Sequence, residues 1–152
     1  MNGPLPAGPV AALVPHAGPM CLLGQVTEWS VDAIRCTATV AARHPLKIGG
    51  RLPATALIEY AAQAMAAHGR LLARDGGAGA GVRPRPGMLA GLRSVELSCR
   101  WVEARDLVIV VDRVGGDDLN VLYRFRVADV AGTALASGRA MVVLDRTQGV
   151  RR

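Results

Sequence analysis

The residues of this chain with the clearest chemical potential are a glutamate and a glutamine set among alanines. Glu59 and Gln63 interrupt the stretch P-A-T-A-L-I-E-Y-A-A-Q-A-M-A-A-H-G from Pro53 to Gly69, which is otherwise mostly Ala, Leu, Ile and Met. Four residues apart on a helix, the two side chains share a face, so the amide can hold or orient the carboxylate. A carboxylate in dry surroundings is costly unless it is hydrogen-bonded or neutralised, which makes Glu59 a candidate for a functional site.

The other side chains that could bind a metal, act as a base or act as a nucleophile are dispersed. They are His16, His44, His68, Cys21, Cys36 and Cys99. No pair of them has the spacing of metal ligands, and the glycine-rich run at 76–81 is not framed as a phosphate-binding loop, so we expect no metal and no bound cofactor. We expect His68, near the far end of the alanine-rich stretch, to be packed or hydrogen-bonded. An odd number of cysteines outside any C-x-x-C motif favours the reducing cytoplasm.

A long buried helix is needed to hold the glutamate, and the rest of the chain reads as strands. Proline in the first turn and few β-branched residues predict a helix that begins at Pro53, continues to Arg74 and stops at Gly76. A helix that is apolar all round is buried in a core or a membrane, and its polar residues and length argue against a membrane span. Alternating apolar and polar residues predict six strands: Gln25–Ser30, Asp32–Val40, Met88–Trp101, Leu107–Val114, Asn120–Val130 and Thr133–Leu144.

The order of two strands, one helix and four strands predicts an α+β fold in a single domain over residues 1–152. A meander with one wet face cannot cover such a helix from one side. Either the sheet curls tightly around the helix, or a second subunit completes the cover. A curved antiparallel sheet wrapped around one long central helix is the hotdog arrangement. We expect a loose arm at 1–12, a flexible loop at 76–87 and a tail at 147–152.

Composition limits the class of partner. The 152-residue chain has a net charge of +6, and Lys47 is the only lysine among its 18 basic residues. The arginines are scattered over the strands without a nucleic-acid motif, so nucleic-acid binding is not favoured. A solvated surface, or steering of an acidic or phosphate-bearing partner, accounts for the charge. No stretch reads as a membrane span, and residues 1–14 contain no Lys or Arg, which argues against a secretory signal peptide.

Several motifs, taken in order, resemble those of the hotdog-fold 3-hydroxyacyl-acyl carrier protein dehydratases. They are P-H-A-G-P-M-C-L-L-G-Q-V at 15–26, H-P-L at 44–46, G-R-L-P-A at 50–54, E-Y-A-A-Q at 59–63 and M-L-A-G-L at 88–92. Within this family the sequence is most similar to the dehydratases of aryl polyene biosynthesis, over roughly Pro15 to Leu144. The resemblance implies that Glu59 is the catalytic carboxylate. The implied substrate-binding residues are Gln63, Arg51, His16, Pro53 and Gly91.

One position departs from the family pattern. Arg51 aligns with the catalytic histidine of the family motif G-H-F-P-G, and an arginine stays protonated near neutral pH, so it cannot serve as a general base. His44, on the same loop before the helix, is the available replacement. Three alternatives remain open: His44 is an exposed loop residue, the chain has lost the chemistry, or Glu59 is structural and pairs with an arginine such as Arg51.

The reaction implied by the resemblance eliminates water from a 3-hydroxyacyl thioester on the phosphopantetheine arm of an acyl carrier protein. It requires a base for the α-proton, an acid for the departing hydroxyl and donors for the enolate-like oxygen, which we assign to His44, Glu59 and the backbone N–H groups at 54–56. The basic charge fits an acidic carrier protein. The resemblance also implies a homodimer, or a heterodimer with another hotdog subunit. A hotdog thioesterase and a non-catalytic subunit of a heterodimeric dehydratase are the alternative functions.

Overall fold

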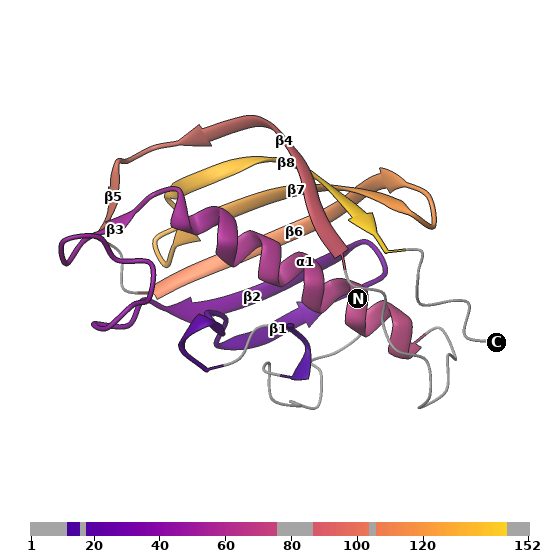
Figure 1. Ribbon diagram of the computed structural model, residues 1–152, viewed down its shortest axis with the longest axis horizontal. Coiled ribbons are helices and arrows are strands. Elements are labelled where there is room, and N and C mark those ends of the chain that lie inside the picture. Colours follow the sequence, from indigo (N-terminus) through magenta and orange to yellow (C-terminus); the bar gives the residue numbers. More distant parts are fainter. Residues whose placement is uncertain (1–11, 16–17, 76–86, 104–105, 146–152) are drawn as a thin grey trace.

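One long helix lies against a curved six-stranded antiparallel sheet in the computed structural model, which describes residues 12–15, 18–75, 87–103 and 106–145 (Figure 1). The helix is α1 (Ala56–Asp75), and the strands of the sheet are β1 (Gln25–Trp29), β2 (Ala33–Thr39), β4 (Gly87–Leu97), β6 (Asp106–Gly116), β7 (Asn120–Asp129) and β8 (Ala134–Leu144). Their order across the sheet is β1-β2-β6-β7-β8-β4. The α+β prediction, a curved antiparallel sheet around one helix, is confirmed.

Some predictions fall on parts of the chain that are not described. His16, the tail at 147–152, all but one residue of the predicted arm at 1–12 and all but one residue of the predicted loop at 76–87 lie outside the described residues. A short 3-10 turn, η2 (Gly18–Met20), precedes β1. Within the described part of the chain, no helix is long and apolar enough to cross a bilayer.

The start of the helix differs from the prediction because two short strands meet there. Strand β3 (Leu52–Pro53) pairs with β5 (Trp101–Val102), so Pro53 belongs to a strand and α1 begins three residues later, at Ala56. The predicted strand Met88–Trp101 is correspondingly divided into β4 and β5. The segment that follows β4 stays beside β8 as far as Ser98, whose N–H donates to the carbonyl oxygen of Leu135 at 3.0 Å, and then separates from it.

The centre of the sheet supplies most of the core beneath α1. On β7, alternate residues face the helix and are buried: Val121, Tyr123, Phe125 and Val127. Arg124 and Arg126, between them, are exposed on the outer face. This is the predicted alternation of a strand with one dry and one wet face.

The helix covers only part of the inner face of the sheet. It packs mainly on β2, β6 and β7, and the edge strand β4 lies beyond it (Figure 1). Three leucines of β4, Leu89, Leu92 and Leu97, lie opposite inner-face residues of β8 but expose 38% to 43% of their surface. The inner face of the sheet is therefore left bare and apolar along its β4 edge.

The helix also has an open side of its own. Ala62, Ala66, Gly69 and Ala73, which follow one another at helical spacing, are half-buried or exposed, and we call them the open stripe of α1. The first of the two arrangements expected for this helix is not observed, because the sheet does not curl fully around it. A second subunit is the arrangement that would cover the open stripe.

Candidate active site

Gln63 is the polar centre of the first half of α1. It is fully buried, and each end of its amide is used. Its Oε1 accepts a hydrogen bond from the N–H of Leu22 at 2.9 Å, and its Nε2 donates to the carbonyl oxygen of Met20 at 2.7 Å. The amide thus ties the loop before β1 to the helix. A buried amide with partners on both sides has a fixed orientation.

Glu59 lies in the first turn of α1, where the helix dipole favours a negative charge. The Nε2 of Gln63 also donates to Glu59 Oε1 at 3.2 Å, so the predicted contact between amide and carboxylate is confirmed. In the single chain Glu59 is half-buried, just before the open stripe begins. Its catalytic role stays a prediction.

His44 is buried and contacts Tyr60 of α1, so the alternative of an exposed loop residue is wrong. Its Nε2 is 2.9 Å from the hydroxyl oxygen of Tyr60, and the N–H of Leu46 donates to its Nδ1 at 3.1 Å. A nitrogen that accepts a hydrogen bond carries no proton, so in the neutral ring Nε2–H donates to Tyr60. Burial lowers the pKa of His44 below its usual value, and the charge of Lys47 lowers it further, which keeps the ring neutral at neutral pH.

The structure does not place His44 and Glu59 in one hydrogen-bonded pair. Tyr60, the partner of His44, is almost completely buried, whereas the neighbouring Glu59 is turned about 100° further around the helix and contacts Gln63. Burial raises the pKa of Tyr60 to about 12, so its hydroxyl stays protonated. To accept a substrate proton, His44 must release one of its two hydrogen bonds. Its role as the base therefore stays a prediction.

Arg51 lies over Trp101. Its guanidinium carbon is 4.6 Å from the ring centroid of Trp101, and that of Arg100 is 5.8 Å from the same centroid. Both distances are within the range of a cation–π interaction. The alternative in which Arg51 neutralises Glu59 gains no support from the described contacts of Arg51.

The remaining predicted residues separate into two groups. Pro53 of β3 lies opposite Trp101 of β5, just before the helix starts. Gly91 lies on the exposed edge strand β4, opposite Met141 of β8. Of the backbone N–H groups at 54–56, that of Ala54 donates to the carbonyl oxygen of Arg100 at 2.9 Å. Ala54 is therefore excluded as a donor to a substrate oxygen.

His68 has the structural role that was predicted for it. It is fully buried, with Nδ1 3.0 Å from the Tyr123 hydroxyl and Nε2 2.9 Å from the carbonyl oxygen of Ser30. Burial is the main cause that lowers the pKa of His68. Each of the chain's two tyrosines thus contacts a buried histidine. Sequence reasoning missed these pairs, because the partners are far apart in the chain.

Metal-binding side chains do not gather in the part of the chain that is described. No three His, Cys, Asp or Glu residues there lie close enough together to hold a metal ion. The cysteines in this part are free, and burial raises the pKa of the Cys36 thiol to about 12. A thiol in such surroundings remains protonated and inert.

Comparison with known proteins relates this chain to a family of dehydratases. Residues 8–148 match the ApeP-like family, described as ApeP dehydratase. The chain is similar to a solved structure, the dehydratase heterocomplex ApeI:P from Xenorhabdus doucetiae, with 25% sequence identity, a TM-score of 0.81 and 93% of each chain covered. No curated protein is similar enough in sequence to count as a relative.

Two further solved structures share the fold at lower identity. One is a hypothetical thioesterase with coenzyme A from Streptococcus pneumoniae, with 11% identity, a TM-score of 0.60 and coverage of 80% of this chain and 84% of that one. The other is the PaaI protein of the phenylacetic acid degradation operon of E. coli, with 12% identity, a TM-score of 0.58 and coverage of 78% and 80%. At such identities the likeness shows the fold alone.

Proposed function

Because this chain belongs to the ApeP-like dehydratase family, we propose that it takes part in the dehydration of 3-hydroxyacyl thioesters to trans-2-enoyl thioesters. The acyl chain would be carried on the phosphopantetheine arm of an acyl carrier protein, in fatty-acid or aryl polyene type biosynthesis. The family supports the reaction class. The sequence motifs and the net charge of +6, which suits an acidic carrier, support the substrate and the carrier.

In this reaction a proton leaves the carbon next to the thioester carbonyl and the 3-hydroxyl departs as water. We assign the acid to Glu59, which gives its proton to the departing hydroxyl, and the orientation of that acid to Gln63. Backbone N–H groups of Thr55 and Ala56 at the helix start are the proposed donors to the developing oxyanion. His44 is the proposed base.

The observation that carries this proposal is the fixed carboxylate at the start of α1. The Nε2 of Gln63 donates to Glu59 Oε1 at 3.2 Å. The hydrogen bonds of Gln63 to Leu22 and Met20 fix the amide, which in turn restricts the rotation of the carboxyl group. The carboxylate is half-buried in the single chain, next to the open stripe of α1. Fixing a reactive group in this way is how proteins make acid catalysis efficient.

Replacing Glu59 tests the proposal. Glu59→Gln, with the complete complex and a 3-hydroxyacyl carrier protein, should lower the rate of elimination by roughly 10²- to 10⁴-fold while leaving the fold unchanged. Glu28→Gln, at an exposed position on β1, is the matched control and should retain the rate. Mass spectrometry of the carrier distinguishes loss of water from hydrolysis. An unchanged rate in Glu59→Gln would refute the acid assignment, and release of free acid would favour the thioesterase alternative.

The base assignment needs its own test, because both ring nitrogens of His44 are engaged. His44→Gln should abolish elimination if this ring is the base. If the rate is retained, the base comes from another subunit, and this chain contributes the acid to a joint site. If Glu59→Gln also retains the rate, this chain is the non-catalytic member of the pair.

We propose a second hotdog subunit as the partner that completes the site. The bare leucines of β4 and the open stripe of α1 are apolar surfaces of the kind that a subunit interface buries. The similar structure from Xenorhabdus doucetiae is described as a heterocomplex, which supports a heterodimer over a homodimer. Sedimentation of the chain alone and with its partner distinguishes the two.

A further inference from the structure

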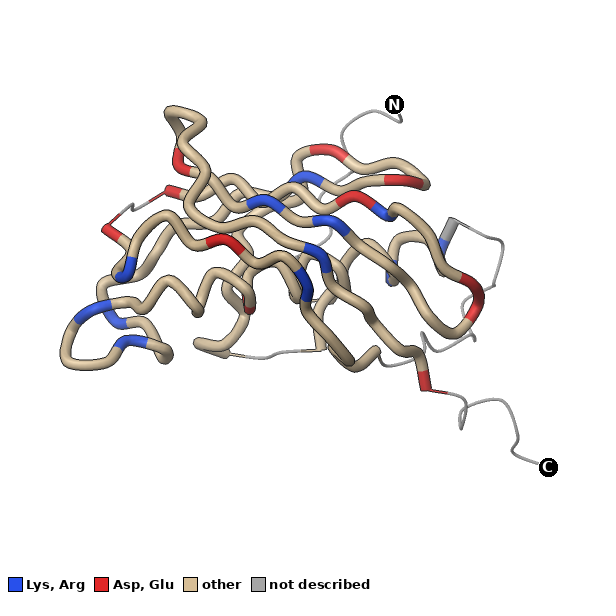
Figure 2. Tube along the Cα trace, turned by 90° about the horizontal axis from the view of Figure 1, so that it is seen from above, with Lys and Arg blue, Asp and Glu red and all other residues tan. Residues whose placement is uncertain are grey.

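Three arginines lie in one row across the outer face of the sheet. Arg124 on β7 is directly opposite Arg139 on β8, and Arg139 is directly opposite Arg93 on the edge strand β4. All three side chains are exposed on the face turned away from the helix. Figure 2 shows basic positions side by side on neighbouring strands. We call these residues the arginine row.

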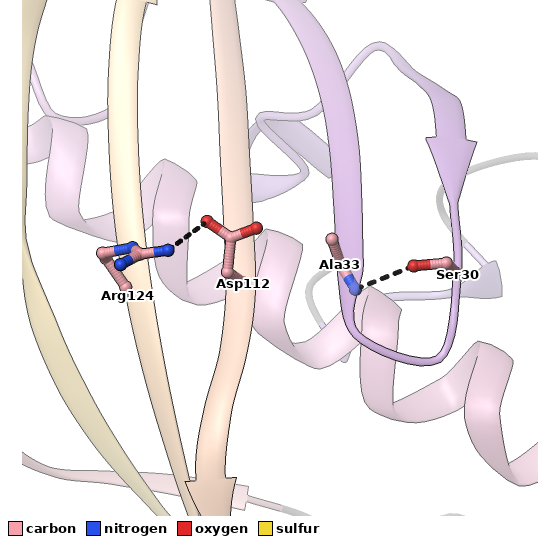
Figure 3. A network of polar contacts seen from close by, with 4 residues as sticks. All are labelled: Ser30, Ala33, Asp112 and Arg124. Atoms are coloured by element: carbon pink, nitrogen blue, oxygen red, sulfur yellow. Dashed lines mark hydrogen bonds and ion pairs between the residues drawn. The ribbon is translucent and has the colours of Figure 1, made fainter. Parts of the chain in front are cut away.

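Such a row is unfavourable by itself, because like charges directly opposite one another on neighbouring strands destabilise a sheet. Among the described residues, one arginine of the row has an ion pair. Asp112 on β6 lies opposite Arg124, with 3.7 Å between its Oδ2 and the arginine Nη2 (Figure 3). Among the described residues, neither Arg93 nor Arg139 has an ion-pair partner. Glu96 on β4, opposite Ser137, lines the same hollow as Arg124 and Arg139. Arg93, at the edge of the sheet, is the arginine of the row that lies outside this hollow.

That end of the row lies at the edge of the sheet, where another chain can add a strand. Suppose that β4 of a second copy paired antiparallel with β4 of this chain along the full length of Gly87–Leu97. Arg93 of this chain would then lie opposite Gly91 of the copy. The two Arg93 side chains would then be diagonal neighbours, within reach of each other. Self-pairing would thus extend the row by another arginine.

We propose that the arginine row selects the subunit that joins β4. It disfavours a second copy of this chain and favours a hotdog subunit whose joining strand presents Asp or Glu on the outer face beside Arg93. This inference rests on the proposed pairing with a second hotdog subunit, and it identifies the chemistry of that partner. Repulsion of the wrong partner and attraction of the right one together set specificity at an interface.

A mixing experiment tests the selection with this chain alone. Arg93→Glu places a carboxylate at the edge and so serves as a stand-in for the acidic partner. At low salt, wild type mixed with Arg93→Glu should associate about fivefold more tightly than wild type with itself, as measured by sedimentation equilibrium. The gain should vanish near 1 M salt, where the screening length is only about 3 Å.

The matched control is Arg35→Glu. It makes the same change in charge on the outer face of β2, on the opposite side of the sheet from β4, and mixing it with wild type should give no gain. Should Arg93→Glu fail to fold, Arg93→Gln removes the repulsion without adding a carboxylate. That variant should associate with itself more tightly than wild type does.

Two results would overturn the inference: a mixture that is no tighter than wild type alone, or a wild-type homodimer that is tight and insensitive to salt. Because these measurements need no substrate, their failure leaves the proposed reaction untouched. An inactive complex that shows the expected association would count against the reaction alone.

Discussion

Gln63 offers a direct test of whether the loop before β1 holds the site together. Gln63→Leu keeps the approximate size of the side chain but removes its hydrogen bonds to Leu22, Met20 and Glu59. The N–H of Leu22 is then buried without a partner, which costs about 1–3 kcal/mol, and the partly buried carbonyl of Met20 adds about 1 kcal/mol. We expect a total loss of roughly 2–4 kcal/mol.

For a domain of this size, that loss corresponds to a fall in Tm of about 10 °C. Urea unfolding followed by circular dichroism gives the free energy directly. The control is Met65→Leu, a buried swap on the same helix that breaks no described hydrogen bond and should cost less than about 1.5 kcal/mol. A Gln63→Leu protein within about 0.5 kcal/mol of wild type would show that these bonds do not hold the loop.

Three further measurements address the rest of the fold. Tyr60→Phe removes the acceptor of His44 Nε2–H and should lower the free energy of unfolding by about 1–2 kcal/mol; no loss in urea unfolding would contradict the hydrogen bond. The pKa of His68 is lowered in the fold, so the unfolded chain binds the proton more readily and stability is lost as pH falls below about 6.5. Wild type should therefore unfold at a lower urea concentration at about pH 5.5 than at about pH 7.5, and this difference should be smaller in His68→Gln. Gly138→Ala places a Cβ 3.0 Å from the Phe125 ring and should lower the free energy of unfolding by about 1–3 kcal/mol, as measured by thermal unfolding. The Cβ added in Gly115→Ala meets no atom within 4 Å, so that variant should lose less stability.

The central helix and the meander were predictable because each carries its own period in the sequence. Val121 to Val127 alternate strictly, and the burial of β7 follows that alternation. The contact between Gln63 and Glu59 was predictable for the same reason, since a spacing of four residues puts both side chains on one face.

The short strands β3 and β5 were missed because no pattern in the neighbouring sequence indicates them. Leu52 and Pro53 form a strand only by pairing with Trp101 and Val102, about fifty positions along the chain, and a proline before an apolar run reads equally well as a helix start. His44 and Tyr60 were not joined by any pattern either. A contact between a loop and a helix depends on how the loop folds back, which periodicity does not encode.

The open stripe shows a different limit of the sequence. Alanine is equally suited to a core and to a surface that another subunit covers, so an alanine-rich helix gives no signal of which face is which. The helix therefore read as buried on all sides, although the sheet covers only one of them. The exposed leucines of β4 make the same point, because a leucine suits a core strand as well as a strand at a subunit boundary, and only its exposed surface distinguishes the two.

The half-burial of Glu59 connects the chemistry to assembly. The carboxylate lies where the uncovered side of α1 begins, so in the single chain water reaches it and competes with a substrate for its hydrogen bonds. A subunit that covers the open stripe would exclude that water and leave the carboxyl group to the substrate. On the proposed mechanism, dehydration should therefore require the complex even if this chain supplies the acid, and the isolated chain should be folded but nearly inactive. Elimination by the isolated monomer at the rate of the complex would contradict this coupling.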